Sequence, residues 1–302
     1  MSSISKVAVA GATGKIGPEI VKQLLAEGFQ VTALTRGSNS QALPSTVVVK
    51  TVDYSSLESL TDALKGHDAV VSLLQPTAVD TAQRVLLDAA VKAQVKRFLP
   101  SEYGSNGSNE KVSQLPFFVP KARFQEAVRI EAAAGNLEYT LICTGPFLDM
   151  CLDLGLFMNL KERSTILYDG GNRLFSTTTV STLAKAVAGV LKHPEQTKNR
   201  VVLVQDIAIT QKRLVEMGEK ATGPDGWKEE EVPVAKLLEE IEEEKKKSVP
   251  SHLVFVLNSI KIGVYGEGYG SHFQNLDNEL LGIKGLTDAE VQSLVNTYAQ
   301  KG

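Results

Sequence analysis

A turn between residues 11 and 17 constrains the fold of this chain more than any other feature. An apolar run from Lys6 to Ala10 precedes it, and this run is typical of a buried strand. A helical pattern follows, with Ile16, Ile20 and Leu24 on one face. Because a helix that starts directly after such a turn offers free N–H groups and partial positive charge, the arrangement predicts a phosphate-binding turn.

The three glycines of this turn have separate expected tasks. Gly11 lets the chain leave the strand sharply, and Gly14 leaves room for a pyrophosphate beside the backbone. Gly17 lets the new helix pack against the strand. The spacing G-x-x-G-x-x-G, set between a strand and an amphipathic helix, predicts dinucleotide binding. We expect every residue of the turn to contact the cofactor: Gly11, Ala12, Thr13, Gly14, Lys15, Ile16 and Gly17.

Short apolar segments alternate with helical patterns throughout the first half. This alternation predicts an α/β fold: a doubly wound parallel sheet of the Rossmann type with helices on both faces. Ligands bind at the carboxyl ends of the strands in such sheets. The expected strands are Lys6–Ala10, Phe29–Leu34, Val47–Val52, Ala69–Leu74, Lys96–Leu99 and Tyr139–Thr144, and the expected helices are Lys15–Glu27, Ser56–Lys65, Thr81–Ala93 and Lys121–Ala134.

The second half loses this alternation, so we expect residues 1–150 to bind the cofactor and residues 151–302 to form a smaller, mixed α/β substrate lobe interleaved with the sheet. Asp169–Asn172 predicts the turn of a hairpin between Thr165–Tyr168 and Leu174–Thr177. The Gly- and Tyr-rich stretch Gly263–Gly270 predicts a mobile loop that could cover a site. Three further elements are expected: a helix over Val180–Lys192, a strand over Arg200–Val204 and a solvated helix over Val234–Lys247.

Composition excludes several classes of protein. Hydrophobic residues make up 43% of the chain, charged residues 22%, and the net charge is −3, which disfavours a nucleic-acid surface. No apolar run is long enough for a membrane span, and Met1–Lys6 lacks the apolar core of a secretory signal. The two cysteines, Cys143 and Cys151, do not form a disulfide framework. We therefore expect a cytoplasmic protein that needs no metal.

Arg36 indicates which dinucleotide binds. NAD sites usually place an acidic residue after the second strand, yet Phe29–Val52 contains none. The strand ends instead at Arg36, where a guanidinium can pair with a 2′-phosphate and stack on adenine. We expect NADP(H), with Gln75 as a further contact at the end of the fourth strand.

The candidate for proton transfer is Lys121. A tyrosine acid would stand four residues earlier in short-chain dehydrogenases, but that position is Phe117. A partly desolvated lysine beside a nicotinamide can donate or take a proton. The four histidines are scattered and more consistent with structural roles: His67, His193, His252 and His272.

The chain resembles the isoflavone-reductase-like, NmrA-like branch of the atypical short-chain dehydrogenases. The resemblance rests on the glycine turn, Arg36, Lys121 and two runs, residues 95–104 and 139–149, the first of which contains Pro100-Ser-Glu-Tyr-Gly104. It covers roughly residues 4 to 205.

This resemblance implies an NADPH-dependent reductase of an aromatic or phenolic secondary metabolite. It further implies that Lys121 is the general acid/base and holds the nicotinamide ribose, and that Gly145, Pro146 and Phe147 border the nicotinamide. The alternative that the family offers is a non-catalytic, NADP(H)-binding regulator that senses redox state. The expected partner is a small aromatic molecule, with no nucleic acid and no membrane, and the chain is expected to be a monomer or homodimer.

Overall fold

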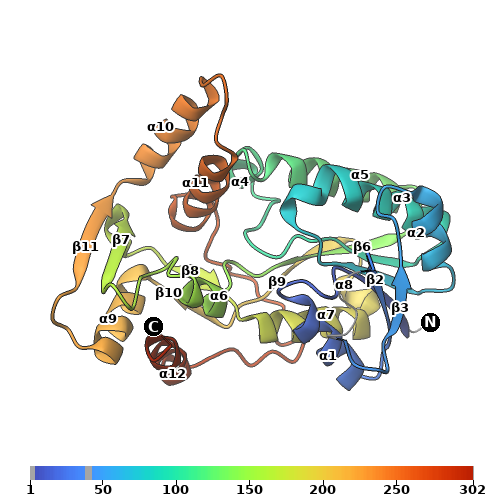
Figure 1. Cartoon of the computed structure of the whole chain (residues 1–302), viewed down its shortest axis with the longest axis horizontal. Coiled ribbons are helices and arrows are strands. Elements are labelled where there is room, and N and C mark those ends of the chain that lie inside the picture. Colours follow the sequence, from blue (N-terminus) through green and yellow to red (C-terminus); the bar gives the residue numbers. More distant parts are fainter. Residues whose placement is uncertain (1–3, 38–42, 302) are drawn as a thin grey trace.

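The computed structural model describes residues 4–37 and 43–301 and contains a seven-stranded parallel sheet at the N-terminal side of the molecule (Figure 1). Its strand order is β3-β2-β1-β4-β5-β6-β9. This arrangement confirms the doubly wound α/β fold. The strands are β1 (Lys6–Ala10), β2 (Gln30–Thr35), β3 (Val48–Thr51), β4 (Ala69–Ser72), β5 (Arg97–Leu99), β6 (Glu138–Cys143) and β9 (Arg200–Leu203).

Helices cover both faces of this sheet because the strands are apolar on both sides. One face packs against α1 and α7, through residues such as Ile20, Leu24 and Val187. The other face packs against α2, α3 and α5, through residues such as Leu60 and Phe124. The bounds are α1 (Gly17–Ala26), α2 (Leu57–Leu64), α3 (Arg84–Lys92), α5 (Val119–Ala133) and α7 (Val180–Lys192), and a π-helical turn, Val79–Gln83, leads into α3.

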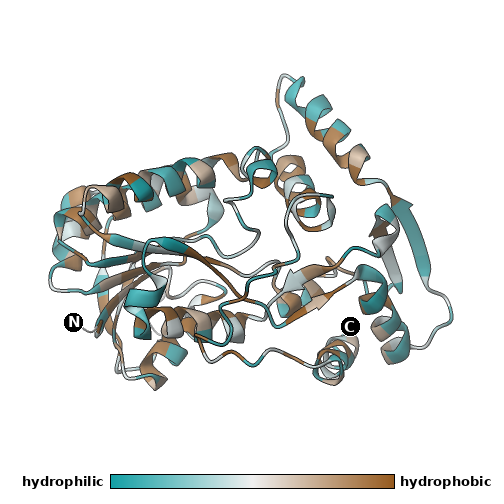
Figure 2. Cartoon of the chain, turned by 180° about the vertical axis from the view of Figure 1, so that it is seen from behind, coloured by the Kyte–Doolittle hydropathy of each residue, from teal (hydrophilic) through white to brown (hydrophobic). Residues whose placement is uncertain are grey.

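The second half of the chain contributes strand β9 to the sheet and helix α7 to one of its faces. Its other residues form a lobe with its own apolar core. Figure 1 shows this lobe on the side away from the N-terminus, with α10 projecting from it. In Figure 2 the ribbon of β11 is hydrophilic, in keeping with its exposed side chains. The remaining elements are α4 (Glu110–Ser113), α6 (Leu148–Asp153), β7 (Ser164–Tyr168), β8 (Phe175–Thr177), α8 (Pro194–Thr197), β10 (Ile207–Ile209), α9 (Gln211–Thr222), β11 (Lys228–Val232), α10 (Val234–Lys245), α11 (His252–Tyr265) and α12 (Asp288–Ala299).

The predicted hairpin around Asp169–Asn172 is wrong. β7 pairs in parallel with β11, and β8 pairs antiparallel with β10, so the two strands never pair with each other. Asp169, Gly170 and Gly171 all have positive φ, and the Asp169 carboxylate accepts the backbone N–H of Val234 at 2.8 Å. The turn therefore serves the start of α10 rather than a hairpin.

The predicted loop over Gly263–Gly270 is also partly wrong, because its first three residues belong to α11. The loop begins at Gly266. Lys111 Nζ donates to the carbonyl of Glu267, and Asn109 Nδ2 donates to that of Gly268, each at 3.2 Å. These bonds fasten the glycine-rich stretch to the start of α4.

Arg97 is a fully buried cation at the amino end of the sheet, and it joins both halves of the chain. Its guanidinium donates to the Glu138 carboxylate at 2.6 Å and to the Pro194 carbonyl at 2.7 Å. It also donates to the hydroxyls of Thr140 and Thr197. Arg97 thus links β5 and β6 to α8.

We expect Arg97→Met to lower the free energy of unfolding by about 2 kcal/mol, because the Pro194 carbonyl and Glu138 lose a charged donor. The Glu138 side chain is 37% exposed, so water limits the loss. The measurement is urea unfolding followed by circular dichroism. Lys65→Met is the control, since it breaks an ion pair whose side chains are 69% and 60% exposed. Equal effects of the two substitutions would contradict this role of Arg97.

Candidate functional site

The glycine turn has the geometry that a pyrophosphate requires. Gly11 has φ +83°, and a Cβ there would lie 2.7 Å from the Leu73 carbonyl oxygen. A Cβ at Gly17 would lie 2.2 Å from the Ala12 carbonyl oxygen, so only glycine lets α1 start this close to β1. No side chain caps α1, but the Gly17 N–H donates to the Gly14 carbonyl at 3.1 Å and Pro18 has no N–H, so this helix start offers a ligand the positive end of its dipole rather than a full set of free donors.

Thr13, Gly14 and Lys15 are exposed in this turn, whereas Ala12 and Gly17 are buried behind it. The exposed residues can contact phosphate directly. Ala12 and Gly17 shape the backbone instead, and their predicted contacts would come through main-chain groups.

The exposed Arg36 lies at one end of a cavity of about 450 Å³ that is also lined by Gly11, Thr13, Gly14 and Gln75. The half-buried Tyr54 forms part of its wall, and its hydroxyl donates to the Leu34 carbonyl at 3.0 Å. Burial raises the pKa of Tyr54 to about 12, so this wall is uncharged. Arg36 is consequently the cation of this cavity among the residues that line it.

A second cavity, of about 460 Å³, adjoins the first and shares Gly14, Leu73, Leu74 and Gln75 with it. The structure brings six further predicted residues to its wall: Lys15, Ile16, Lys121, Gly145, Pro146 and Phe147. Predicted residues from four separate strand ends thus line these two adjoining cavities.

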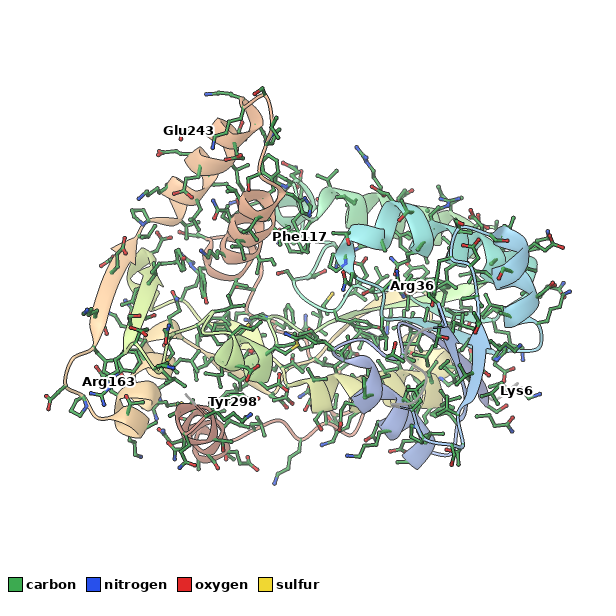
Figure 3. The ribbon with its side chains drawn as sticks, in the orientation of Figure 1. Lys6, Arg36, Phe117, Arg163, Glu243 and Tyr298 are labelled. Atoms are coloured by element: carbon green, nitrogen blue, oxygen red, sulfur yellow. The ribbon has the colours of Figure 1, made fainter. Side chains whose placement is uncertain are left out.

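The part of this cavity farthest from the glycine turn is apolar. Its walls come from the segment before α5, from α6 and the residues after it, and from α11: Phe117, Phe118, Met150, Cys151, Leu154, Leu156, Ile260 and Val264. Figure 3 shows Phe117 beside α11, with Arg36 on the side of the molecule that holds the parallel sheet. Leu148, Phe157 and Met158 lie behind these walls in the core of the lobe.

Gly145 holds the carboxyl end of β6 against the lobe. It has φ +64°, and a Cβ there would lie 2.0 Å from the Ser176 carbonyl oxygen. The next residue, Pro146, accepts a hydrogen bond from the Thr177 hydroxyl at 2.7 Å. These contacts fix the segment that borders the cavity, from Gly145 to Phe147.

Lys121 lies in the first turn of α5 with only 5% of its surface exposed, although it lines the cavity. Its Nζ lies 5.9 Å from the centre of the Phe117 ring. A lysine at the start of a helix ordinarily lies on the surface, but Lys121 is buried. A buried ammonium at the wall of an apolar cavity can reach a reacting group there and transfer a proton.

The sequence analysis missed Glu102 as a site residue, although it quoted the run that contains it. Glu102 follows β5 and is 2% exposed. Burial raises its pKa, and the Lys121 ammonium opposes that rise. An acidic residue three positions beyond a buried strand, in a loop at the ligand edge, was the signal that could have identified it.

The wall from α11 was also missed, because the sequence analysis expected a loop where Val264 lies in a helix. The His252–Tyr265 stretch lacks a clear amphipathic period, since it packs on several sides. Cys151, Leu154 and Leu156 were likewise not expected at the cavity. Cys143 and Cys151 are both free thiols.

Among residues 4–37 and 43–301, no helix is both long and apolar enough to cross a membrane. Within the same ranges, His, Cys, Asp and Glu side chains form no group of three that could hold a metal ion.

Among the known proteins that resemble this chain in sequence are a fungal oxidoreductase and a plant pinoresinol reductase. Oxidoreductase aprR of Aspergillus flavus is 37% identical over 224 residues, which cover 72% of this chain and 74% of that protein. Pinoresinol reductase 1 of Arabidopsis thaliana is 29% identical over 248 residues, covering 72% and 75%.

Solved structures share the fold. A leucoanthocyanidin reductase–NADPH complex from Vitis vinifera superposes with a TM-score of 0.79 at 20% identity, covering 98% of this chain and all of that one. The structure described as AtPrR2 with NADP+ and (+)pinoresinol gives 0.77 at 24% identity, covering 99% of this chain and 100% of that one. The model of the NmrA-like family matches residues 3–267, beyond the region that the sequence analysis identified. The chain belongs to the NmrA-like family.

Proposed function

We propose that this protein is an NADPH-dependent reductase of an aromatic or phenolic secondary metabolite, with Lys121 as its general acid/base. The observation that carries the proposal is the continuous hollow that runs from Arg36, past the glycine turn, to Lys121 and an apolar chamber. A dinucleotide and a flat apolar molecule fit such a hollow end to end. The relatives named above as an oxidoreductase and as a pinoresinol reductase support the same class of reaction.

The cofactor is NADP(H). Arg36 and the start of α1 would hold its phosphates, and Gly145 to Phe147 would border its nicotinamide. NADPH supplies a hydride when bound. The chain's own residues orient the substrate, exclude water with apolar side chains and supply a proton from Lys121 to an oxygen that becomes negative.

Arg36→Ala tests the choice of cofactor. The substitution removes a charge-assisted contact to the 2′-phosphate, so we expect NADPH affinity to fall by about 2 kcal/mol, roughly thirtyfold, while NADH affinity hardly changes. Isothermal titration calorimetry with both cofactors measures this. Lys22→Ala, an exposed cation on α1, is the matched control. Unchanged NADPH affinity in Arg36→Ala, or equal affinity of the wild type for NADH, would disprove the assignment.

Turnover tests the reaction class. We expect the wild type to oxidise NADPH in the presence of some members of a panel of aromatic enones and benzylic ethers, because the chamber beyond Lys121 is apolar. The measurement is the fall in NADPH absorbance over time, and mass spectrometry identifies the product. Tight NADPH binding with no consumption across the panel would favour the alternative, a regulator that senses redox state.

Lys121→Ala tests the proton donor. Because positioned proton transfer typically contributes 10²–10⁴-fold, we expect kcat to fall by about that factor. The fold should persist, since alanine is well tolerated in a helix. Lys121→Arg should not restore kcat, because a guanidinium does not release its proton near neutral pH. If all three proteins turn over within a few-fold, Lys121 is a binding contact and the proton has another source.

A further inference from the structure

The apolar chamber is the part of the second cavity that lies farthest from the glycine turn, and its walls carry hydrocarbon side chains and one thiol, that of Cys151. Burial raises the pKa of this thiol to about 12, so it is uncharged at pH 7. The polar side chains that line the same cavity come from the glycine turn, from the segments after β4 and β5, and from the start of α5: Lys15, Gln75, Ser101, Tyr103, Ser105 and Lys121. A ligand that fills this cavity therefore meets polar groups at one end and hydrocarbon at the other.

The backbone N–H groups of the chamber walls are already engaged. The Phe117 N–H donates to the Ser259 hydroxyl at 3.3 Å. Ile260 and Val264 stand inside α11, where N–H groups bond within the helix. The N–H groups of four further wall residues donate to backbone carbonyls: those of Phe118, Cys151, Leu154 and Leu156. A hydroxyl group that a ligand carried into this chamber would thus lose its water partners and gain no N–H group in exchange.

Two leucines continue the apolar wall to the surface of the protein. Leu154 and Leu156 are 52% and 53% exposed, although both line the cavity. Gly155 lies between them with φ +66° and donates its N–H to the Leu152 carbonyl at 3.3 Å, while the Leu156 N–H donates to the Cys151 carbonyl at 2.8 Å. This pair of bonds is the Schellman ending of a helix. The end of α6 therefore fixes the backbone of both leucines at the mouth of the chamber.

We propose that the chamber is a subsite for a hydrocarbon substituent of the substrate, an alkyl or alkenyl chain that the aromatic ring carries at the end away from the bond to be reduced. The reacting end lies at Lys121, and the chain crosses the chamber and lies on Leu154 and Leu156. Contact between the chain and these leucines removes apolar surface of both from water. The proposal rests on the proposed function for the reacting end, whereas the preference for hydrocarbon is a property of the walls alone.

Ser105 is the polar side chain nearest to the chamber walls, and it defines the main alternative. A Cβ at Gly263 of α11 would lie 3.3 Å from Ser105 Oγ and 3.6 Å from Phe118 Cε2, so the serine hydroxyl lies beside two walls of the chamber. In the alternative, this hydroxyl recognises a hydroxyl group on the ring of the substrate. Removal of the Ser105 hydroxyl would then weaken the binding of a phenol and leave the binding of a hydrocarbon analogue unchanged.

A contact between two copies of the chain is the other use that exposed leucines could have. Leu154 and Leu156 would then affect the association of the protein and not the binding of a ligand. Because both leucines also line the cavity, we favour the subsite. Sedimentation velocity of a variant that lacks both leucine side chains separates the two explanations.

Equilibrium dialysis in the presence of NADP+ measures binding apart from turnover, because NADP+ has no hydride to transfer. The probes are three 4-arylbut-3-en-2-ones, aromatic enones whose ring carries a hydroxyl, a methyl or an n-butyl group at the para position. We expect the methyl compound to bind about tenfold or more tightly than the hydroxyl compound, because the hydroxyl group loses its water partners. The n-butyl compound should bind about tenfold more tightly than the methyl compound, because its longer chain reaches the leucines.

The double substitution of Leu154→Ser with Leu156→Ser tests the mouth of the chamber. It should remove most of the advantage of n-butyl over methyl and keep the advantage of methyl over hydroxyl, because the inner walls are unchanged. The fold should persist, since both side chains are about half exposed. Leu174→Ser with Leu238→Ser is the matched control, because it replaces leucines that are 43% and 38% exposed away from the cavity. The control should bind all three compounds like the wild type.

Met150→Gln keeps the proposal testable even if the double leucine variant does not fold. Met150 is half-buried at the chamber wall, and glutamine has an unbranched side chain of similar length that ends in an amide. A hydroxyl group in the chamber would then have a partner, so we expect the ratio of methyl to hydroxyl affinity to fall by about tenfold. An unchanged ratio would contradict the position assigned to the ring substituent.

Three results would overturn the proposal: the hydroxyl compound binds as tightly as the methyl compound, Ser105→Ala weakens the hydroxyl compound alone, or the double leucine variant sediments differently while its binding is unaltered. The proposed function is judged separately. If the three compounds bind in the expected order but no aromatic enone oxidises NADPH, the reductase assignment fails and the subsite stands. If enones are reduced but the three compounds bind alike, the reductase assignment stands and the subsite fails.

Discussion

The burial of a lysine at the wall of an apolar cavity is the constraint on which the site depends. An ammonium withdrawn from water must be compensated by a nearby charge or by dipoles. Here the Phe117 ring lies 5.9 Å from Lys121 Nζ, and the Lys121 charge opposes the rise that burial causes in the pKa of Glu102. Both depend on the loop after β5 and the start of α5 being held in register.

The sheet holds that register. Gln83, from the π-helical turn before α3, accepts from the Ser72 hydroxyl and from the Ser101 backbone N–H. The Gly104 carbonyl then accepts from the backbone N–H groups of Thr144 and Gly145. These bonds connect the ends of β4, β5 and β6 in sequence. Glu102 and Lys121 consequently sit on a rigid edge of the sheet rather than on free loops.

Most of the sheet could be predicted from the sequence because each strand is a short, apolar run between turn residues. β1 and α7 have the predicted bounds, and the other predicted strands and helices of the sheet differ by one or a few residues. The glycine turn was also predictable, since the tight approach of Gly17 to Ala12 is a local property of the backbone. Ser56 caps α2 by accepting from the Ser59 N–H, which is the role that serine favours at a helix start.

The lobe could not be predicted in this way, because its pairings join segments that are far apart in the sequence. β7 and β11 are separated by more than one helix, yet they form a parallel ladder from Ser164–Lys228 to Tyr168–Val232. The segment Asp169–Asn172 has the composition of a hairpin turn, and tertiary contacts override it. Local propensity contains no information about a partner strand that lies sixty residues later.

The same distinction separates the residues of the site that were predicted from those that were not. Arg36, Lys121 and the glycine turn follow from their positions relative to strand ends, which a parallel sheet brings together. Glu102 satisfies the same positional rule, yet its importance depends on being buried, on Gln125 and on the unsatisfied Oε1. Sequence places a chemical group near the site, and packing decides whether that group is hydrated or must share its charge with a neighbour. Glu102 and Lys121 are both withdrawn from water, so the polarity of the cavity arises from the way α5 packs on β5 and β6.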